Sequence, residues 1–175
     1  MQVPSEDDLT DETIRCKEQA TYRLASIYKD KGLVEELINL TKAILPLCVD
    51  FPKSKLAKMT RTLFDQCIKI EGRHQQLVDL CQHIIQWCET ENRSFLRMRI
   101  ETNQADLYFK MQKFNDSLQI LNKLTYELKK KEDKQLLVES QLVESKVHHA
   151  LENLPKAKAA LTSVKTVANS IYIVP

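Results

Sequence analysis

The chain is poor in glycine and proline, with 2 glycines and 5 prolines among its 175 residues. Strands joined by tight hairpins depend on residues that accept unusual backbone conformations, and two glycines supply few such turns. The long stretches rich in Leu, Lys, Glu, Gln and Ala favour helices instead. We therefore predict an all-α protein, long enough to bury a sizeable core.

Several other features that would mark a functional class are also missing. The 26 basic and 24 acidic residues leave a net charge of +2, which argues against a dedicated nucleic-acid binder. No apolar run approaches the roughly 20 residues that span a bilayer, so no membrane partner is expected. The N-terminus, MQVPSEDDLTDE, lacks the basic start and apolar segment of a signal peptide.

The sequence shows no pattern that indicates catalysis. It lacks a glycine-rich phosphate loop, a GxSxG motif and an HExxH motif, so we expect neither an enzyme nor a bound cofactor. The cysteines are odd in number and form no CxxC pair; they stand at Cys16, Cys48, Cys67, Cys81 and Cys88. We interpret them as reduced thiols of a protein from the cytoplasm or nucleus.

A repeat of about forty residues runs through the chain. Four turn-like stretches, YKDKGLVEEL, IKIEGRHQQL, FKMQKFNDSL and HALENLPKAK, have spacings of 40, 41 and 40 residues between their anchors, which are Gly32, Gly72, Lys113 and Asn153. Gly and Asn accept the left-handed conformation that closes a helix, and the lysine is the weaker case. A leucine follows eight residues after each anchor, at Leu40, Leu80, Leu121 and Leu161.

Helices are expected on both sides of each anchor. We place those before the anchors at about 12–31, 53–71, 93–112 and 133–152. Those after the anchors carry apolar stripes at helical spacing, such as Leu77, Cys81, Ile84 and Cys88. Pro52 and Asp133 suit helix starts, whereas Pro46 should kink or shorten its helix.

Four helix–turn–helix units follow, each too thin to bury its stripe alone. Stacking would bury the stripes, which predicts a right-handed α-solenoid of tetratricopeptide-like hairpins over residues 12–172. Residues 1–11 are expected to be loosely ordered. Such a solenoid presents an extended surface to other proteins, and a general adaptor that binds peptide segments of a partner is one functional reading.

Three groups of residues could be taken for binding sites. His148 and His149 point about 100° apart on a helix and match bulky pairs before the other anchors, so we interpret them as packing at a turn. Cys81, His83 and Cys88 lack a fourth zinc ligand, and buried free thiols are the simpler interpretation. Lys55, Lys58 and Arg61 form a basic row on one helix face. This basic row is more consistent with a solvated face than with a binding site for an acidic partner.

Two further segments have simple structural interpretations. Trp87 occupies a stripe position and is expected in the core. The stretch LKKKEDK, residues 128–134, should form a solvated turn after a helix C-terminus, where lysines favour the last carbonyl groups.

The segment ELKKKEDKQLLVESQLVESKVHHALENLPKAKAALTSVKTVANSIY, residues 127–172, resembles the non-ATPase regulatory subunit 11 family of the 26S proteasome lid. The likeness extends upstream through ENRSFLRMRIETNQADLYF to CKEQATYRLASIYKDKG, more loosely in the first half. It therefore covers most of the chain from Cys16 onward and corresponds to the N-terminal solenoid portion of that family.

The resemblance implies a non-catalytic scaffold of the regulatory particle. It implies contacts with other lid subunits, with the core-particle α-ring and with the ATPase ring, and a place in the cytoplasm and nucleus. The family's C-terminal PCI domain is not expected within these residues. Because the family's binding surface is not a short motif, the resemblance assigns no individual contact residues.

Overall fold

The computed structural model describes residues 6–48, 51–70 and 72–171. For residues 6–10 it describes the backbone alone. Within these ranges every regular element is a helix and no strand is present, so the all-α prediction is confirmed. None of the described helices combines the length and the apolar character that a membrane crossing requires. The chain divides into two compact units, residues 1–72 and 73–175.

The first unit contains three helices: α1 (Glu6–Asp30), α2 (Val34–Leu47) and α3 (Lys53–Cys67). Both α2 and α3 contact α1, and α2 also packs against α3. The core of this unit includes the fully buried side chains of Leu37, Met59, Leu63 and Phe64. Helix α1 starts before residue 12, so the expected loosely ordered segment is helical from Glu6, and residues 1–5 lie outside the description.

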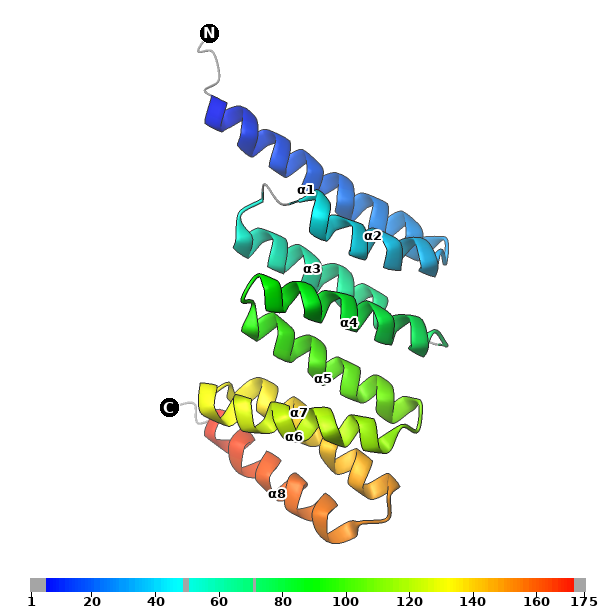
Figure 1. Ribbon diagram of the computed structural model, residues 1–175, viewed down its shortest axis with the longest axis vertical. Helices are drawn as coiled ribbons and strands as arrows, with labels where there is room; N and C mark the ends of the chain where they lie inside the picture. Colours follow the sequence, from blue (N-terminus) through cyan, green and yellow to red (C-terminus); the bar gives the residue numbers. More distant parts are fainter. Residues whose placement is uncertain (1–5, 49–50, 71, 172–175) are drawn as a thin grey trace. The chain divides into compact units, whose positions relative to one another are not determined.

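The second unit contains five helices among its described residues: α4 (His74–Thr90), α5 (Ser94–Lys110), α6 (Phe114–Lys131), α7 (Lys134–Ala150) and α8 (Leu154–Ile171). Each helix packs on the next along the chain, and α5 also contacts α7 (Figure 1). This order of contacts is that of a stack of helical hairpins. The right-handed twist and the tetratricopeptide-like detail stay predictions.

The turns reveal the true register of the repeat. Positive φ angles occur at 20-residue intervals from position 72 to position 152 and also at Gly32; the residues are Gly32, Gly72, Asn92, Gln112, Glu132 and Glu152. Gly32 and Gly72, the first two anchors, have φ angles of 68° and 85°. At the third and fourth anchors the left-handed residues are Gln112 and Glu152, one position earlier than we expected.

Lys113 and Asn153 therefore need correcting as left-handed anchors. Their backbone N–H groups donate to the carbonyls of Tyr108 and His148, at 2.9 Å in both cases, just as Leu33 donates to Tyr28 at 2.8 Å. This hydrogen bond is the one that closes a Schellman motif, and it falls on the residue after the left-handed position. The sequence pattern misled because Gln112 and Glu152 carry a Cβ, which disfavours that conformation.

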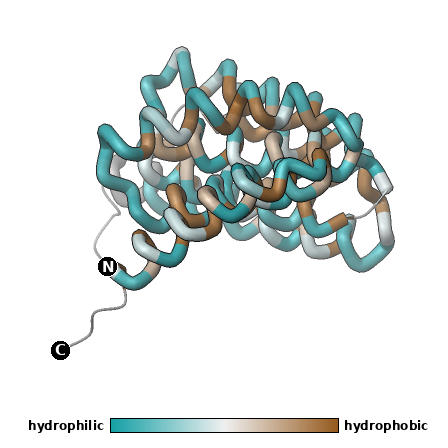
Figure 2. Tube along the Cα trace, turned by 90° about the horizontal axis from the view of Figure 1, so that it is seen from below, coloured by the Kyte–Doolittle hydropathy of each residue, from teal (hydrophilic) through white to brown (hydrophobic). Residues whose placement is uncertain are grey.

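Burial follows the corrected forty-residue register. In α3, α5 and α7, buried residues recur at three sets of positions: Leu56, Leu96 and Leu136; Thr60, Ile100 and Ser140; Cys67, Leu107 and Val147. In the helices after each turn, Ile44, Ile84, Leu124 and Val164 form one such set. Hydrophobic positions recur at short intervals along the helices, between hydrophilic stretches (Figure 2).

The four repeat leucines do not share one environment. Leu80 and Leu121 are fully buried and Leu40 is half-buried, whereas Leu161 is 42% exposed. In the corrected register, the residue equivalent to Leu80 in α8 is Ala160, which is buried. Leu161 stands at the same repeat position as Thr41, Cys81 and Leu121, which are fully buried, so α8 departs from the repeat at this position and the expectation that Leu161 lies in a buried stripe is wrong.

Paired helices approach closely where both carry small residues. The hydroxyl of Ser117 on α6 donates to the carbonyl of Ala105 on α5 at 2.8 Å. One repeat later, the hydroxyl of Ser145 on α7 donates to the carbonyl of Ala157 on α8 at 3.0 Å. Both contacts join positions twelve apart in sequence, so the crossing point of the hairpin is itself repeated.

The helix boundaries agree with the local chemistry of the ends. The carboxylate of Asp133 accepts a hydrogen bond from the N–H of Leu136 at 3.1 Å, which confirms it as an N-cap. Pro52 is the residue just before α3. Helix α2 ends at Leu47, directly after Pro46, so it is shorter than the other helices, as expected when an i−4 hydrogen bond is missing.

Candidate interaction site

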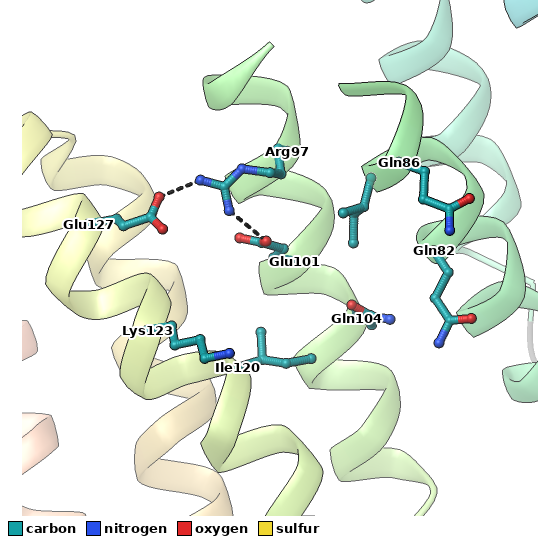
Figure 3. Close-up of a pocket in the computed structure, with 9 residues that line it drawn as sticks. Gln82, Gln86, Arg97, Glu101, Gln104, Ile120, Lys123 and Glu127 are labelled. Atoms are coloured by element: carbon teal, nitrogen blue, oxygen red, sulfur yellow. Dashed lines mark hydrogen bonds and ion pairs between the residues drawn. The ribbon is translucent and has the colours of Figure 1, made fainter. Parts of the chain in front are cut away.

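A pocket of about 320 Å³ lies in the second unit, where α4, α5 and α6 each present one face. Its charged and amide-bearing walls are shown in Figure 3. The lining residues are Gln82, Ile85 and Gln86 from α4, Arg97, Glu101 and Gln104 from α5, and Ile120, Lys123 and Glu127 from α6. Helical spacing explains the set: on α5 and α6 the residues follow at intervals of three and four.

Arg97 joins two of the helices by ion pairing. Its Nη1 lies 2.7 Å from Oε1 of Glu101, one turn along α5, and its Nη2 contacts Oε2 of Glu127 on α6 (Figure 3). The Arg97 and Glu101 side chains are each 18% exposed, so solvent screens this pair only in part. Charge-assisted bonds of this kind fix the positions of both helices.

The pKa of Glu101 lies above its ordinary value. Burial raises this pKa, and the charge and hydrogen bond of Arg97 oppose the rise. For Arg97, burial lowers the pKa, but hydrogen bonding to Glu127 and the charge of Glu101 outweigh it, and the net shift is upward. The arginine therefore stays charged, and its charge limits how far burial raises the pKa of Glu101.

We expect the substitution Arg97→Met to destabilise the chain by about 1–3 kcal/mol at neutral pH, because two carboxylates lose a charged donor. The pKa of Glu101 should then rise further. A carboxyl whose pKa is higher in the folded than in the unfolded state contributes full stability below its unfolded pKa, and the contribution is lost as pH rises through the folded pKa.

The loss caused by Arg97→Met should therefore shrink as the pH is lowered from about 7 to about 5, where protonation relieves the uncompensated charge. Urea unfolding at both pH values measures it. Arg61→Met is the matched control, because Arg61 is 54% exposed and lies 3.9 Å from its partner carboxylate on Asp65. It should cost about 0.5 kcal/mol or less at either pH. An equal loss for Arg97→Met at both pH values would contradict the assignment.

The remaining polar residues of the pocket are amides and one amine. Gln104 is only 6% exposed. Gln82 and Gln86 are exposed on α4 and face the same space (Figure 3). The Lys123 side chain extends from α6 toward the pocket. Ile85 and Ile120 add half-buried apolar surface.

The residues that suggested a metal do not come together. Cys81 and Cys88 are buried, whereas His83 is exposed on another face of α4. Burial raises the pKa of the Cys88 thiol to about 12, which keeps it protonated. Among the described residues, no three His, Cys, Asp or Glu side chains are grouped so that they could hold a metal ion.

The histidine pair belongs to a turn. His148 is buried at 9% exposure, and its carbonyl accepts the hydrogen bond that closes the end of α7. Its ring lies 3.9 Å from the carboxylate of Glu144, whereas His149 is exposed. The two side chains thus face different surroundings and do not converge on one ligand.

The basic row is partly neutralised within the chain. The Nζ of Lys55 lies 3.0 Å from the carboxylate of Glu18 on α1, and Arg61 pairs with Asp65 at 3.9 Å.

Trp87 is half-buried, so the expectation that it lies in the core was too strong. Residues 129–131 form the last turn of α6, followed by Glu132 and the N-cap Asp133.

Sequence reasoning did not find the pocket. The i,i+4 spacing of Arg97 and Glu101 was a visible signal for an ion pair on one helix face. The contact with Glu127, thirty positions away, has no local signature. Gln104 was equally hidden, because a glutamine within a helix indicates nothing about whether its amide is buried.

Comparison with known proteins gives the family. Residues 2–111 match the model of the 26S proteasome regulatory subunit RPN6 N-terminal domain. A 26S proteasome non-ATPase regulatory subunit 11 homolog from Arabidopsis thaliana is 38% identical over 99% of this chain and 42% of its own length. A probable 26S proteasome regulatory subunit rpn6 from Schizosaccharomyces pombe is 39% identical over 91% of this chain and 38% of its own.

A 26S proteasome non-ATPase regulatory subunit 11 from Dictyostelium discoideum is 40% identical, again over 91% of this chain and 38% of its own length. The chain thus spans about two fifths of the length of these relatives. The family resemblance drawn from the sequence is confirmed. The match to the domain model covers more than half of the chain, and the chain belongs to the family of the 26S proteasome regulatory subunit RPN6 N-terminal domain.

Proposed function

We propose that this chain is a non-catalytic structural part of the proteasome regulatory particle lid, acting in ubiquitin-dependent protein degradation. It would contact other lid subunits, the ATPase ring and the α-ring of the core particle, in the cytoplasm and nucleus. The observation that carries the proposal is the match of residues 2–111 to the RPN6 N-terminal domain. The names of the relatives, all proteasome regulatory subunits, support it.

The arrangement of the described residues supports binding rather than chemistry. Stacked helices give a long surface at which many weak contacts with other proteins can add up. The titratable groups with raised pKa values are accounted for by burial and by helix-joining contacts, such as those of Arg97 and Glu101. The pocket between α4, α5 and α6 holds an ion pair and amides, which suit recognition of a polypeptide.

A binding assay with purified particles tests the proposal. The 175-residue chain, immobilised through a terminal tag, is incubated with intact core particle, with and without the ATPase ring. We expect retention of core particle, and stronger retention when the ATPase ring is present, because two contacts then act together. No retention of either particle, together with binding of short soluble peptides, would favour a general peptide adaptor over a proteasome scaffold.

A further inference from the structure

We propose that the start of α5 and the end of α6 form a docking surface for a short acidic segment of a partner protein, one that carries an apolar side chain between its carboxylates. This surface, the Phe95 patch, consists of Phe95 on α5 and of Lys129, Lys130 and Lys131 on α6. The inference goes beyond the proposed function, because it assigns a ligand chemistry to one place on the chain, whichever protein supplies the segment.

The first step is the exposure of the aromatic residue. Phe95 is the second residue of α5 and is 64% exposed. Lys55 and Gln135 occupy the equivalent places in α3 and α7, and all three residues directly precede a buried leucine. The fold therefore accepts a charged or amide side chain at this place and does not need the phenyl ring. Aromatic side chains are among those that contribute most to binding at protein interfaces.

The second step is the firm support of the ring. Leu96, the next residue, is buried, and Arg97 joins α5 to α6 through its contact with Glu127. One residue further, Met98 packs in a cluster with buried leucines of α6 and α7. A side chain on a backbone that is already fixed loses less conformational freedom on binding, so more of the contact energy appears as affinity.

The third step is the positive charge beside the ring. The Nζ of Lys131 lies 5.4 Å from the centroid of the Phe95 ring, a cation–π contact. Lys129 and Lys130 belong to the same last turn of α6 and are exposed. Within the part of the chain that the structure describes, none of these lysines forms an ion pair with a carboxylate. Their charges are open to the carboxylates of a partner.

The acidic residues nearby limit the kind of anion that fits. Glu132 follows directly after the lysines, and Glu89 and Glu91 stand at the end of α4, shortly before Phe95 in the chain. A duplex nucleic acid carries one charge about every 1.7 Å along its axis and would bring phosphates against these carboxylates. A polypeptide can place a few carboxylates on one turn of lysines and an apolar side chain on the ring. Charge complementarity therefore favours an acidic segment of a protein.

Backbone amide signals of residues 94–96 and 129–131 in ¹⁵N NMR spectra of the 175-residue chain provide the test. The probe is acetyl-Glu-Asp-Leu-Asp-Glu-amide. A second peptide has Gly in place of Leu, and a third has Gln and Asn in place of the acids. We expect the signals to shift and saturate with the first peptide. The second should bind about threefold more weakly, and the third about tenfold or more, because each lacks one of the two contacts.

Two sets of substitutions make the test specific to the patch. Phe95→Gln copies the residue at the equivalent place in α7, so the urea midpoint should not change, whereas binding of the first peptide should weaken about fivefold or more. Lys129→Gln combined with Lys130→Gln should weaken it by about tenfold. The double variant should also reduce the loss of affinity between about 50 and about 300 mM NaCl, since exposed charges are screened by salt.

The matched control combines Leu154→Gln with Lys156→Gln on α8. Leu154 is 52% exposed and Lys156 is exposed as well, so this pair offers the same kinds of groups at another place in the second unit. We expect the control to bind the first peptide as tightly as the unaltered chain does.

Four outcomes overturn the inference. They are the absence of a saturable shift at residues 94–96 and 129–131, undiminished binding after Phe95→Gln, equal weakening by the control, and tighter binding of a uridine hexanucleotide than of the acidic peptide. Retention of the core particle is measured separately. A chain that retains the particle but binds no acidic peptide would therefore contradict this inference and leave the proposed function standing.

Discussion

Leu121→Ala is expected to lower the free energy of unfolding by about 2–5 kcal/mol, the range for a leucine truncated in a closed core. Leu121 is fully buried on α6 and belongs to the cluster formed with Ala105 of α5 and with Val143 and Val147 of α7. Three helices therefore line the cavity that the substitution would leave. Urea unfolding followed by circular dichroism measures the change.

Leu161→Ala is the matched control for burial. From the sequence the two leucines occupy equivalent places, eight residues after an anchor, yet Leu161 is 42% exposed. Its truncation should cost about 1 kcal/mol or less. Similar losses for the two variants would mean that α8 buries Leu161 as α6 buries Leu121, which would contradict the exposure of Leu161.

Ser117→Leu is expected to destabilise the chain by an amount near the upper end of about 1–3 kcal/mol, the usual range for overpacking. Ser117 is fully buried, and its hydroxyl bonds to the backbone carbonyl of Ala105 at 2.8 Å. A leucine would have to push α5 and α6 apart, because a main-chain atom cannot rotate away as a side chain can. Thermal and urea unfolding both report the loss.

Ser117→Ala separates the two causes at this position. It removes one hydrogen bond without adding volume, and should cost about 1 kcal/mol. The corresponding residue one repeat later is already alanine, Ala157, and is buried at 6% exposure. If Ser117→Leu proved no worse than Ser117→Ala, the close approach of the two helices would not be a property of the protein in solution.

The features that could be predicted from the sequence are those that depend on the pattern of residues along one stretch of the chain. The stripe of Leu77, Cys81, Ile84 and Cys88 predicted the inward face of α4, and all four side chains are buried. Asp133 could be recognised as an N-cap because a carboxylate there accepts a backbone N–H. The forty-residue spacing was also visible, since the same kind of turn recurs between the two helices of each hairpin.

What could not be predicted depends on the balance between local preference and packing. Gln112 and Glu152 adopt the left-handed conformation without being glycines, because the hydrogen bonds that close α5 and α7 outweigh the strain at Cβ. The exposed fractions of Leu161 and Trp87 depend on how the neighbouring helices pack on α8 and α4. The pocket is assembled by residues from three helices, so no single stretch of sequence contains it.

Hydrogen exchange along the second unit tests whether each helix is held by its neighbours in the stack. Helix α6 packs on both α5 and α7 and buries Leu121, Leu124 and Leu128, whereas the buried side chains of α8 are the smaller Ala157, Ala160 and Val164. Amides of α8 in the 175-residue chain should therefore exchange at least about tenfold faster than those of α6, through local opening that leaves α5–α7 intact. Equal protection of α6 and α8, lost together in one step, would contradict a stack stabilised helix by helix.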